Sequence, residues 1–389
     1  MQRSLVGSEM CIRDSSMEND AMTEQELEKA LRTAAEADVA VIFAGLPEIF
    51  ESEGYDRTSM KLPQCQDRLI EEVLKVQPNV VVVLHNGSPV ELPWADKVSA
   101  ILEMYLGGQG VGEACDRLLY GEANPSGRLA ETFPYRLEDN PSYLHFPGNG
   151  KRVLYGEDIF VGYRYYDTKK VPVRYAFGHG LSYTEFAYGD LNLSSAQMTD
   201  EDILTVSFKV KNTGKTEGKE VVQLYVADMC GISERPVKEL KGFAKVHLLP
   251  GEEKTVSMEI SARDLSYYEE RLGDWYAPSG TYRILIGHAS DDVRLHADII
   301  FETQKELPLC VDFTTTFGEL LDHTKTAPVI TELLAPLAAA AASAEGMSDE
   351  YKKLGEQVIR EMPLKFLLGQ MPGEQVEQLI GQLNCLLAQ

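Results

Sequence analysis

The stretch NVVVVLHNG, residues 79–87, decides the fold of the first part of this chain. Such a continuous β-branched run predicts a strand that is buried on both faces, as strands are in parallel sheets. The runs DVAVIFAG (38–45) and VSAILEMYLGG (98–108) predict two further strands on either side of it in the sequence. Segments with helical spacing alternate with these strands, at residues 22–36, 64–76 and 111–121. This alternation predicts an α/β domain with a mainly parallel sheet.

Three loops leave the carboxyl ends of the predicted strands. The first contains ESEGYDRT (51–58), the second is HNGSPVELPW (85–94) and the third is YLGGQG (105–110). In open parallel sheets the carboxyl ends of the strands meet at one edge, and ligands bind there. We therefore expect the three loops to lie on one rim and to hold the candidate site.

The sequence pattern changes after the α/β part. Residues 122–185 are rich in glycine, proline and aromatic residues, which predicts long ordered loops with short strands. Beyond residue 186 the apolar residues alternate with period two, which predicts a small all-β sandwich of the immunoglobulin or fibronectin type. Four segments carry this alternation, at residues 203–215, 220–228, 254–261 and 280–290.

The end of the chain, beyond residue 304, is predicted to be helical. Residues 349–362 and 373–388 are amphipathic, whereas 331–346 has low complexity and fits either a helix or a linker. Two interpretations remain for this tail. It could be a helical cap packed on the body, or it could form a contact in a homo-oligomer.

Charge and cysteine content exclude several classes of protein. The formal charge of −24 argues against nucleic acid and anionic membrane surfaces as partners, because both require a basic footprint. No apolar run approaches the ~18 residues of a membrane-spanning helix. The six cysteines form no CxxC pair, so no zinc knuckle or disulfide framework is indicated. Dispersed cysteines favour a reducing compartment such as the cytoplasm.

The first residues, MQRSLVGSEMCIRDSS, are unusual. They lack the apolar core of a secretory signal. They resemble a peptide that is often produced when sequencing-adapter DNA is translated at the edge of an assembled fragment. We therefore interpret residues 1–17 as a non-native leader, in which case the native gene extends upstream and this chain is a C-terminal piece.

The strongest chemical candidate is Glu53. A carboxyl group on a loop at the end of a strand can act as a general acid if its surroundings raise its pKa. Phe50 and Tyr55 could remove Glu53 partly from water. Asp56 and Arg57 could pair with each other and fix the loop. The alternative from composition alone is a charged surface loop without chemistry.

Other motifs carry weaker signals. GGQGVG (107–112) lacks the G-x-G-x-x-G spacing and is interpreted as a turn between a strand and a helix. His85 and His179 have no second ligand at metal spacing, so structural hydrogen bonding is favoured over metal binding. GRLAETFP and YGEDIFVGYRYYD are expected to tie domains together. Three tyrosines in the second motif fit a packed aromatic core better than a sugar-stacking platform: Tyr163, Tyr165 and Tyr166.

A series of motifs in this order resembles glycoside hydrolase family 3, in particular the C-terminal half of its β-glucosidases. The series is ESEGYDRTSMKLP, LHNGSPVELPW, YLGGQGVGEACDRLLYGEANPSGRLAETFP and VLYGEDIFVGYRYYD, followed by YAFGHGLSYTEF. It spans residues 38–186, and residues 186–303 are similar to the fibronectin type III-like domain that ends many of these enzymes. The resemblance implies an α/β sandwich domain over residues 18–185, which is expected to be incomplete, and a helical extension over 304–389.

The resemblance also implies a mechanism. In this family a (β/α)8 barrel carries the nucleophilic aspartate, and the α/β sandwich domain lends a loop with the acid/base glutamate. The glutamate before Gly-Tyr in the matching motif maps onto Glu53, rather than Glu51 or Glu48. Tyr55, Asp56 and Arg57 are implied as loop-fixing or substrate-binding residues. No metal or organic cofactor is implied, and the substrate would be a β-linked glucoside or short oligosaccharide.

The sequence departs from the family in one large respect, because the barrel is absent. The only string near the family's Ser-Asp-Trp-like nucleophile site is GDW (273–275), and it lies in the predicted β region. We interpret its Asp274 as a turn residue and expect the nucleophile to be outside this chain. Two hypotheses follow. The chain is a fragment of a retaining, exo-acting β-glycosidase that is inactive alone, or it is a non-catalytic carbohydrate-binding or scaffold protein.

Overall fold

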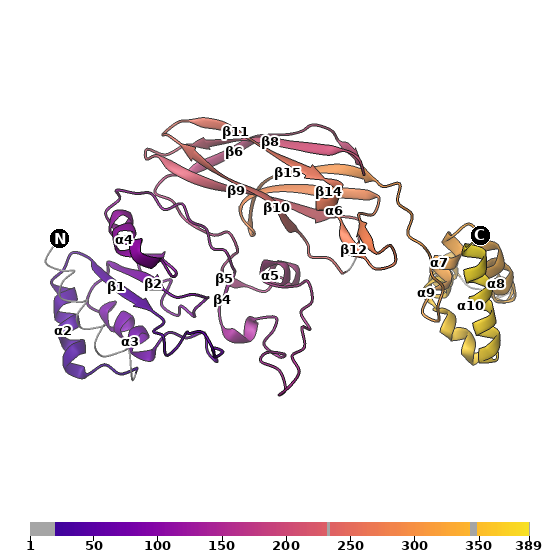
Figure 1. Cartoon of the computed structure of the whole chain (residues 1–389), viewed down its shortest axis with the longest axis horizontal. Helices are drawn as coiled ribbons and strands as arrows, with labels where there is room; N and C mark the ends of the chain where they lie inside the picture. The colour runs from indigo at the N-terminus through magenta and orange to yellow at the C-terminus, as the bar shows by residue number, and fades with distance from the viewer. Residues whose placement is uncertain (1–19, 232–233, 343–347, 389) are drawn as a thin grey trace. The chain divides into compact units, whose positions relative to one another are not determined.

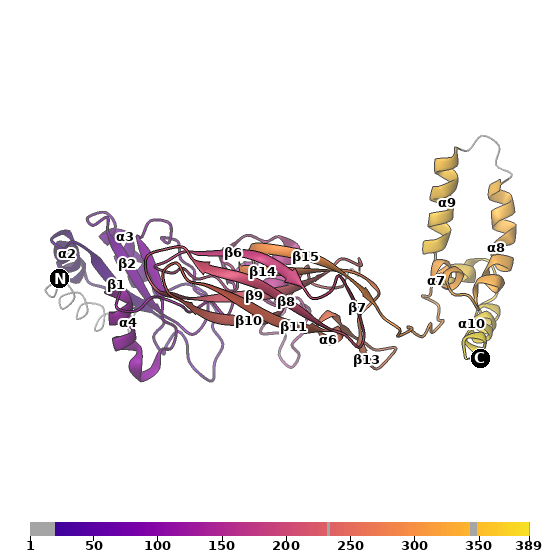
Figure 2. The same cartoon turned by 90° about the horizontal axis from the view of Figure 1, so that it is seen from above.

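The structure is a computed structural model, and it describes residues 20–231, 234–342 and 348–388. The residues interpreted as a leader, 1–17, lie outside the described part. The chain divides into two compact units, whose elements Figures 1 and 2 show from two directions. The first unit comprises the chain up to Ser266 together with Ala277–Gln304. The second comprises Tyr267–Tyr276 together with Lys305–Gln389.

The first unit opens with the predicted parallel sheet. Its order is β1 (Ala40–Gly45), β2 (Val80–His85) and β3 (Ala100–Glu103), and both pairings are parallel. The predicted helices are α2 (Glu24–Ala35), α3 (Gln64–Val73) and α4 (Val111–Leu119). Val80, Val82 and Val83 of β2 are fully buried, as the β-branched run predicted.

Strand β3 is shorter than the predicted run, and its backbone explains why. Tyr105 has a φ of 49° and Gly108 a φ of 65°, and neither value fits an extended strand. The chain therefore turns after Glu103 and enters the 3₁₀ turn η1 (Gly108–Gly110), which leads into α4. GGQGVG is thus a strand-to-helix turn, as its spacing indicated.

The segment after α4 consists mainly of loops with short strands, as predicted. It contains β4 (Phe133–Pro134), η2 (Leu137–Asp139), α5 (Tyr163–Lys169) and β5 (Val173–Tyr175). The sequence did not predict helix α5, because its aromatic residues show no clear apolar stripe. Its ends are set by left-handed backbone, with a φ of 57° at Gly162 and 54° at Lys170.

Two facing sheets form the predicted sandwich. The larger has the order β10-β9-β14-β15-β7 and the smaller β11-β8-β6. Their bounds are β6 Phe186–Leu193, β7 Gln197–Thr199, β8 Ile203–Asn212, β9 Gly218–Asp228, β10 Glu239–Leu248, β11 Glu253–Ser261, β14 Gly280–Ala289 and β15 Asp292–Glu302; a short helix, α6 (Ala262–Leu265), follows β11. Inward-facing residues such as Phe208, Leu224 and Ile284 form one buried core, as the period-two pattern required.

The second unit is helical, with one hairpin. Its elements are β12 (Tyr267–Glu269), β13 (Asp274–Tyr276), α7 (Phe317–Asp322), α8 (Ala327–Ala342), α9 (Asp349–Glu361), η3 (Leu364–Gly369) and α10 (Gly373–Leu387). Phe317, Leu320 and Leu364 lie in its own core. The low-complexity stretch is therefore helical as far as Ala342. Asp274 begins strand β13 instead of lying in the turn, because its backbone pairs with Glu269.

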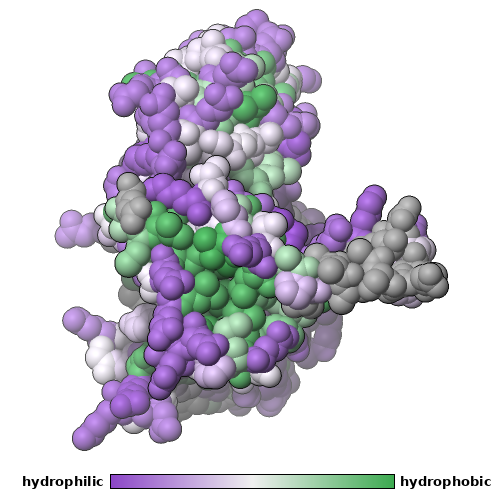
Figure 3. Space-filling model, turned by 90° about the vertical axis from the view of Figure 1, so that its right-hand side faces the viewer, coloured by the Kyte–Doolittle hydropathy of each residue, from purple (hydrophilic) through white to green (hydrophobic). Residues whose placement is uncertain are grey.

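The surface of the helical unit is partly apolar. Figure 3 shows an apolar area on the end of the chain that faces the viewer. Large apolar side chains of this unit are exposed on α9 and η3, namely Tyr351, Leu354, Val358, Phe366 and Leu368. Within the described ranges, however, no helix combines the length and apolar content needed to cross a membrane.

Candidate active site

The loop after β1, residues 46–63, carries the four predicted site residues. Gly54 has a φ of 95°, a left-handed conformation that glycine adopts without strain. The chain reverses at this glycine, and the O–H of Tyr55 donates a hydrogen bond to the carbonyl oxygen of Glu48. Glu53 directly precedes the reversal, so it occupies the tip of the loop.

Glu53 is exposed, and no hydrogen bond or ion pair to its side chain is found among the described residues. Tyr55 is 50% exposed and its hydroxyl binds the carbonyl oxygen of Glu48, and the described residues leave Glu53 open to water. Any desolvation of Glu53 must come from outside the described part of this chain. Its side chain is free to meet a ligand.

Arg57 fixes the loop through partners other than the expected one. Its Nη1 lies 3.4 Å from Oε1 of Glu51 and donates a hydrogen bond to the hydroxyl of Ser88. Its Nη2 lies 3.4 Å from the carbonyl oxygen of Pro89. Asp56 is exposed and forms no ion pair with Arg57 among the described residues. The arginine therefore joins the first loop to the second.

All three loops meet at the predicted rim. Oε2 of Glu51 accepts a hydrogen bond from the backbone N–H of Gly87 at 2.6 Å. The side-chain amide of Asn86 donates to Oε2 of Glu103, at the end of β3, over 3.2 Å. Each contact joins the carboxyl ends of neighbouring strands. The expectation of a shared rim is confirmed.

Five residues at this rim form what we call the rim cluster: Glu51, Arg57, Ser88, Glu103 and Glu131. Burial raises the pKa of Glu103 to about 7, against the opposing effect of hydrogen bonds from the Tyr105 N–H and Asn86. Burial also raises the pKa of Glu131, and the charge of Glu51 adds to this effect. Burial lowers the pKa of Arg57, while Glu51 opposes the change. The charges of Glu51 and Glu131 both act on Arg57, and the same two carboxylates act on Glu103.

Sequence reasoning missed most of the rim cluster. It named Arg57 but passed over Glu51, and it gave no role to Ser88, Glu103 or Glu131. The available signal was position, since Ser88 and Glu103 each lie at or just after the carboxyl end of a predicted strand. Glu131 lies in GRLAETFP, far along the chain, and only the fold reveals its proximity.

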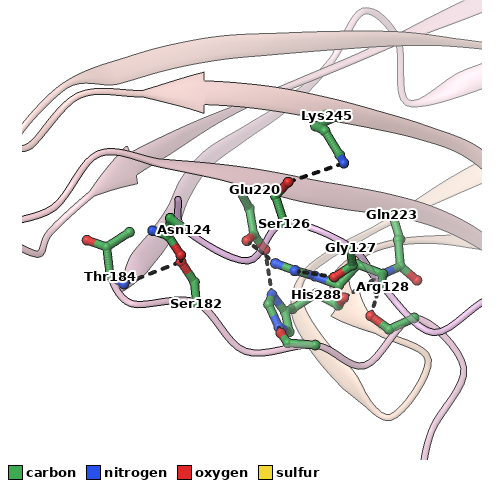
Figure 4. Close-up of polar contacts among 12 residues, drawn as sticks. Asn124, Ser126, Gly127, Arg128, Ser182, Thr184, Glu220, Gln223, Lys245 and His288 are labelled. Carbon is green, nitrogen blue, oxygen red and sulfur yellow. Dashed lines mark hydrogen bonds and ion pairs between the residues drawn. The ribbon is translucent and has the colours of Figure 1, made fainter. Parts of the chain in front are cut away.

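The motif GRLAETFP ties domains together, as expected. Figure 4 shows Arg128 of this motif beside Glu220 on strand β9 of the sandwich. Their side chains are 5% and 0% exposed, and Nη2 lies 2.7 Å from Oε2. The other carboxylate oxygen lies 2.6 Å from the hydroxyl of Tyr188 and 2.5 Å from Nδ1 of His288. We call these four residues the junction cluster.

The aromatic motif packs as a core. Tyr163 stacks on Phe177 at 4.8 Å and meets Tyr225 edge-on at 5.8 Å, both measured between ring centroids. Its hydroxyl also accepts a hydrogen bond from the N–H of Leu240 at 2.7 Å. Tyr166 is 3% exposed. These contacts support packing over a sugar-stacking role.

Comparison with known proteins assigns the domains. Residues 10–183 match the glycosyl hydrolase family 3 C-terminal domain, and residues 220–290 match the fibronectin type III-like domain. These are the C-terminal domains of glycoside hydrolase family 3. The order of the two domains is the one that the motif series implied.

Individual relatives extend the match. Thermostable beta-glucosidase B of Acetivibrio thermocellus is 46% identical over 372 residues, which cover 95% of this chain and 49% of the relative. The beta-glucosidase of Kluyveromyces marxianus is 44% identical over 286 residues, or 73% of this chain and 33% of the relative. The chain therefore spans about half of the first family 3 relative and a third of the second.

Solved structures give the same result. The K. marxianus beta-glucosidase in complex with glucose is 42% identical, with a TM-score of 0.68 over 72% of this chain and 33% of that one. A family 3 beta-glucosidase of Bifidobacterium adolescentis is 38% identical, with a TM-score of 0.74 over 82% of this chain and 46% of that one. At these identities the likeness concerns the family as well as the fold.

Proposed function

We propose that this chain supplies the acid/base part of a retaining, exo-acting β-glycosidase, with β-glucosides or short β-linked oligosaccharides as substrates. The observation that carries the proposal is the place of Glu53. It is an exposed carboxyl group at the tip of a loop on the carboxyl edge of a family 3 sheet. The names of the relatives, which are β-glucosidases, support the substrate class.

Glu53 would act twice in the reaction. It first gives its proton to the glycosidic oxygen as the leaving group departs, and then it takes a proton from the water that attacks the glycosyl intermediate. The nucleophile is a second carboxylate, about 5–5.5 Å from the first in retaining enzymes. We place that nucleophile outside this chain, on a (β/α)8 barrel encoded upstream.

An exposed apolar segment supports the need for that barrel. Leu144, Leu154 and Tyr155 are 85%, 63% and 80% exposed, and further large apolar residues of the same segment are also exposed. Exposed apolar surface of this extent is typical of an interaction site. A preceding domain that covers residues 143–161 would bury these side chains.

The experiment compares Glu53→Ala with the parent in a polypeptide that joins this chain to its upstream barrel. For aryl β-glucosides with poor leaving groups, we expect kcat/KM to fall by about 10²–10⁴-fold, because those groups need a proton. Activated leaving groups should lose much less, and added azide should partly restore turnover. The isolated 389-residue chain should hydrolyse neither class.

Glu48→Ala is the matched control, since Glu48 is exposed on the same loop. It should leave the kinetics unchanged. An equal loss for all leaving groups in Glu53→Ala, without azide rescue, would contradict the acid/base role. Rapid turnover by the isolated chain would contradict the placement of the nucleophile.

A further inference from the structure

We propose that Glu51 is the positioning residue of this site: it anchors the loop that presents Glu53 by cross-linking it to the loop after strand β2. This inference rests on the proposed function of Glu53. It assigns a separate task to a glutamate only two residues away, to which the motif itself gives no role.

The contacts of Glu51 occupy both of its carboxylate oxygens. Oε2 accepts a hydrogen bond from the N–H of Gly87 at 2.6 Å, and Oε1 accepts one from the hydroxyl of Ser88 at 2.7 Å. Arg57 Nη1 lies 3.4 Å from Oε1. The Glu51 side chain is 21% exposed, so water competes only partly for these bonds. Such charge-assisted bonds are stronger and shorter than neutral ones.

Gly87 is fitted to this contact. A Cβ atom at residue 87 would lie 3.1 Å from Oε2 of Glu51, closer than side-chain contacts normally come. The absence of a side chain therefore lets the backbone N–H approach the carboxylate. The contact therefore depends on a glycine at position 87 as well as on Glu51.

The anchor restricts Glu53 because the chain between them is short. Two residues span at most about 7 Å even when fully extended. On the other side of Glu53, the left-handed Gly54 and the bond from Tyr55 to Glu48 close the loop. The tip is therefore held on both sides, while the Glu53 carboxyl group itself stays free.

The same contacts separate the roles of the two glutamates. A proton donor must have a carboxyl oxygen available to the substrate, and both oxygens of Glu51 already accept bonds from the protein. Glu53 has no such partner among the described residues. The positive charge of Arg57 interacts with the carboxylates of both Glu51 and Glu131.

The first test follows the loop itself in the 389-residue chain. Glu51→Gln keeps the shape but replaces one acceptor oxygen with an amide group, so the N–H of Gly87 or the Ser88 hydroxyl loses its acceptor. Amide hydrogen exchange of peptides covering residues 48–58 and 86–89 should become about tenfold faster or more. Gly87→Ala should have the same effect through its added methyl group. Glu48→Gln, as the matched control, should not.

The second test measures the chemistry in the polypeptide that includes the barrel. Glu51→Gln should lower kcat for poor leaving groups by roughly 10- to 100-fold, as a misplaced catalytic group does. KM should stay nearly constant, and activated leaving groups should be spared. A uniform loss over all leaving groups, or a loop that exchanges no faster, would overturn the positioning role.

The two proposals fail in different ways. If Glu53→Ala shows no leaving-group dependence, the acid/base assignment fails whatever Glu51→Gln does. If Glu53→Ala behaves as expected but Glu51→Gln matches the Glu48→Gln control, the positioning role fails alone.

Discussion

Two glutamates in the first unit cross-link distant segments, and their burial differs. Glu220 of the junction cluster is fully buried between Arg128, Tyr188 and His288. Glu51 of the rim cluster keeps 21% of its side chain exposed, and its partner Arg57 keeps 17%. Both carboxylates accept bonds on both oxygens. Only the first is sealed from water.

This difference in burial predicts that the two glutamates affect different properties of the protein, one its stability and the other its active-site loop. A buried ion pair that loses one member leaves an uncompensated charge in the interior, and this is strongly destabilising. At a partly hydrated rim, water replaces lost partners at little cost, so the fold survives while the local geometry changes. We therefore expect the junction cluster to govern the folding of the first unit and the rim cluster to govern the loop of Glu53.

The largest effect should come from Glu220→Ala. Removing this carboxylate leaves the Arg128 guanidinium buried without a counter-charge, and the free energy of unfolding should fall by about 3–5 kcal/mol. Glu51→Ala should cost about 1 kcal/mol or less. Urea denaturation followed by circular dichroism would measure both.

The control for this pair is the double variant Arg128→Met/Glu220→Leu. It removes both charges and fills the space with apolar side chains, so it should recover much of the stability lost in Glu220→Ala. Equal losses for Glu220→Ala and Glu51→Ala would break the comparison, because burial would then not decide the cost.

A smaller effect should appear in the pH dependence of Glu103→Gln. Burial raises the folded pKa of Glu103 to about 7, against about 4.3 in an unfolded chain. Between these values the folded state retains a proton that the unfolded state has lost, so stability falls as pH rises. Relative to the variant, the parent should lose of the order of 1 kcal/mol between pH 4 and 8, allowing for solvent screening.

Glu103 is half-buried, so its effect on stability should lie between that of the fully buried Glu220 and that of an exposed carboxylate. Glu131 and Glu51 add to its pKa shift through repulsion. The charge of Arg57 lowers the pKa of Glu131, so Arg57→Met should raise that pKa further and enlarge the pH dependence of stability. Unfolding midpoints measured across the pH range for parent and variants would show it. A flat difference between parent and Glu103→Gln would mean that water reaches Glu103 freely.

Local patterns predicted much of the fold. The valine run of β2 and the alternation in β8 and β9 have strong periods, because burial on two faces or one dictates them. Helix α5 escaped prediction because its aromatic residues show no clear apolar stripe and because its ends are set by left-handed backbone, at Gly162 and Lys170. Such a conformation leaves little trace in hydrophobic periodicity.

The candidate site was predictable only where it is local. Glu53 stands out through its motif, but the pairing of Arg57 does not follow from its neighbours. Adjacent residues in a non-helical chain tend to point in different directions, so Arg57 turns from Asp56 towards Glu51 and Ser88. Glu103 could have been found from its place at the end of a predicted strand, whereas Glu131 joins the cluster through tertiary contacts that no sequence pattern reveals.

The smallest effect on stability is expected for Asp96→Asn, because Asp96 is an exposed carboxylate that pairs with an arginine. Arg174 holds the Asp96 carboxylate with two hydrogen bonds, at 2.8 and 2.7 Å, and its own side chain is 11% exposed. Asp96 itself is 86% exposed, so water can replace its bonds to the arginine. Arg174 also lies over the rings of Tyr135 and Tyr175, which hold it without the aspartate.

The urea midpoint of Asp96→Asn should therefore stay at the parent value, although the geometry of this ion pair is as good as that of Arg128 and Glu220. A loss comparable to that of Glu220→Ala would show that geometry, rather than burial, sets the strength of these pairs.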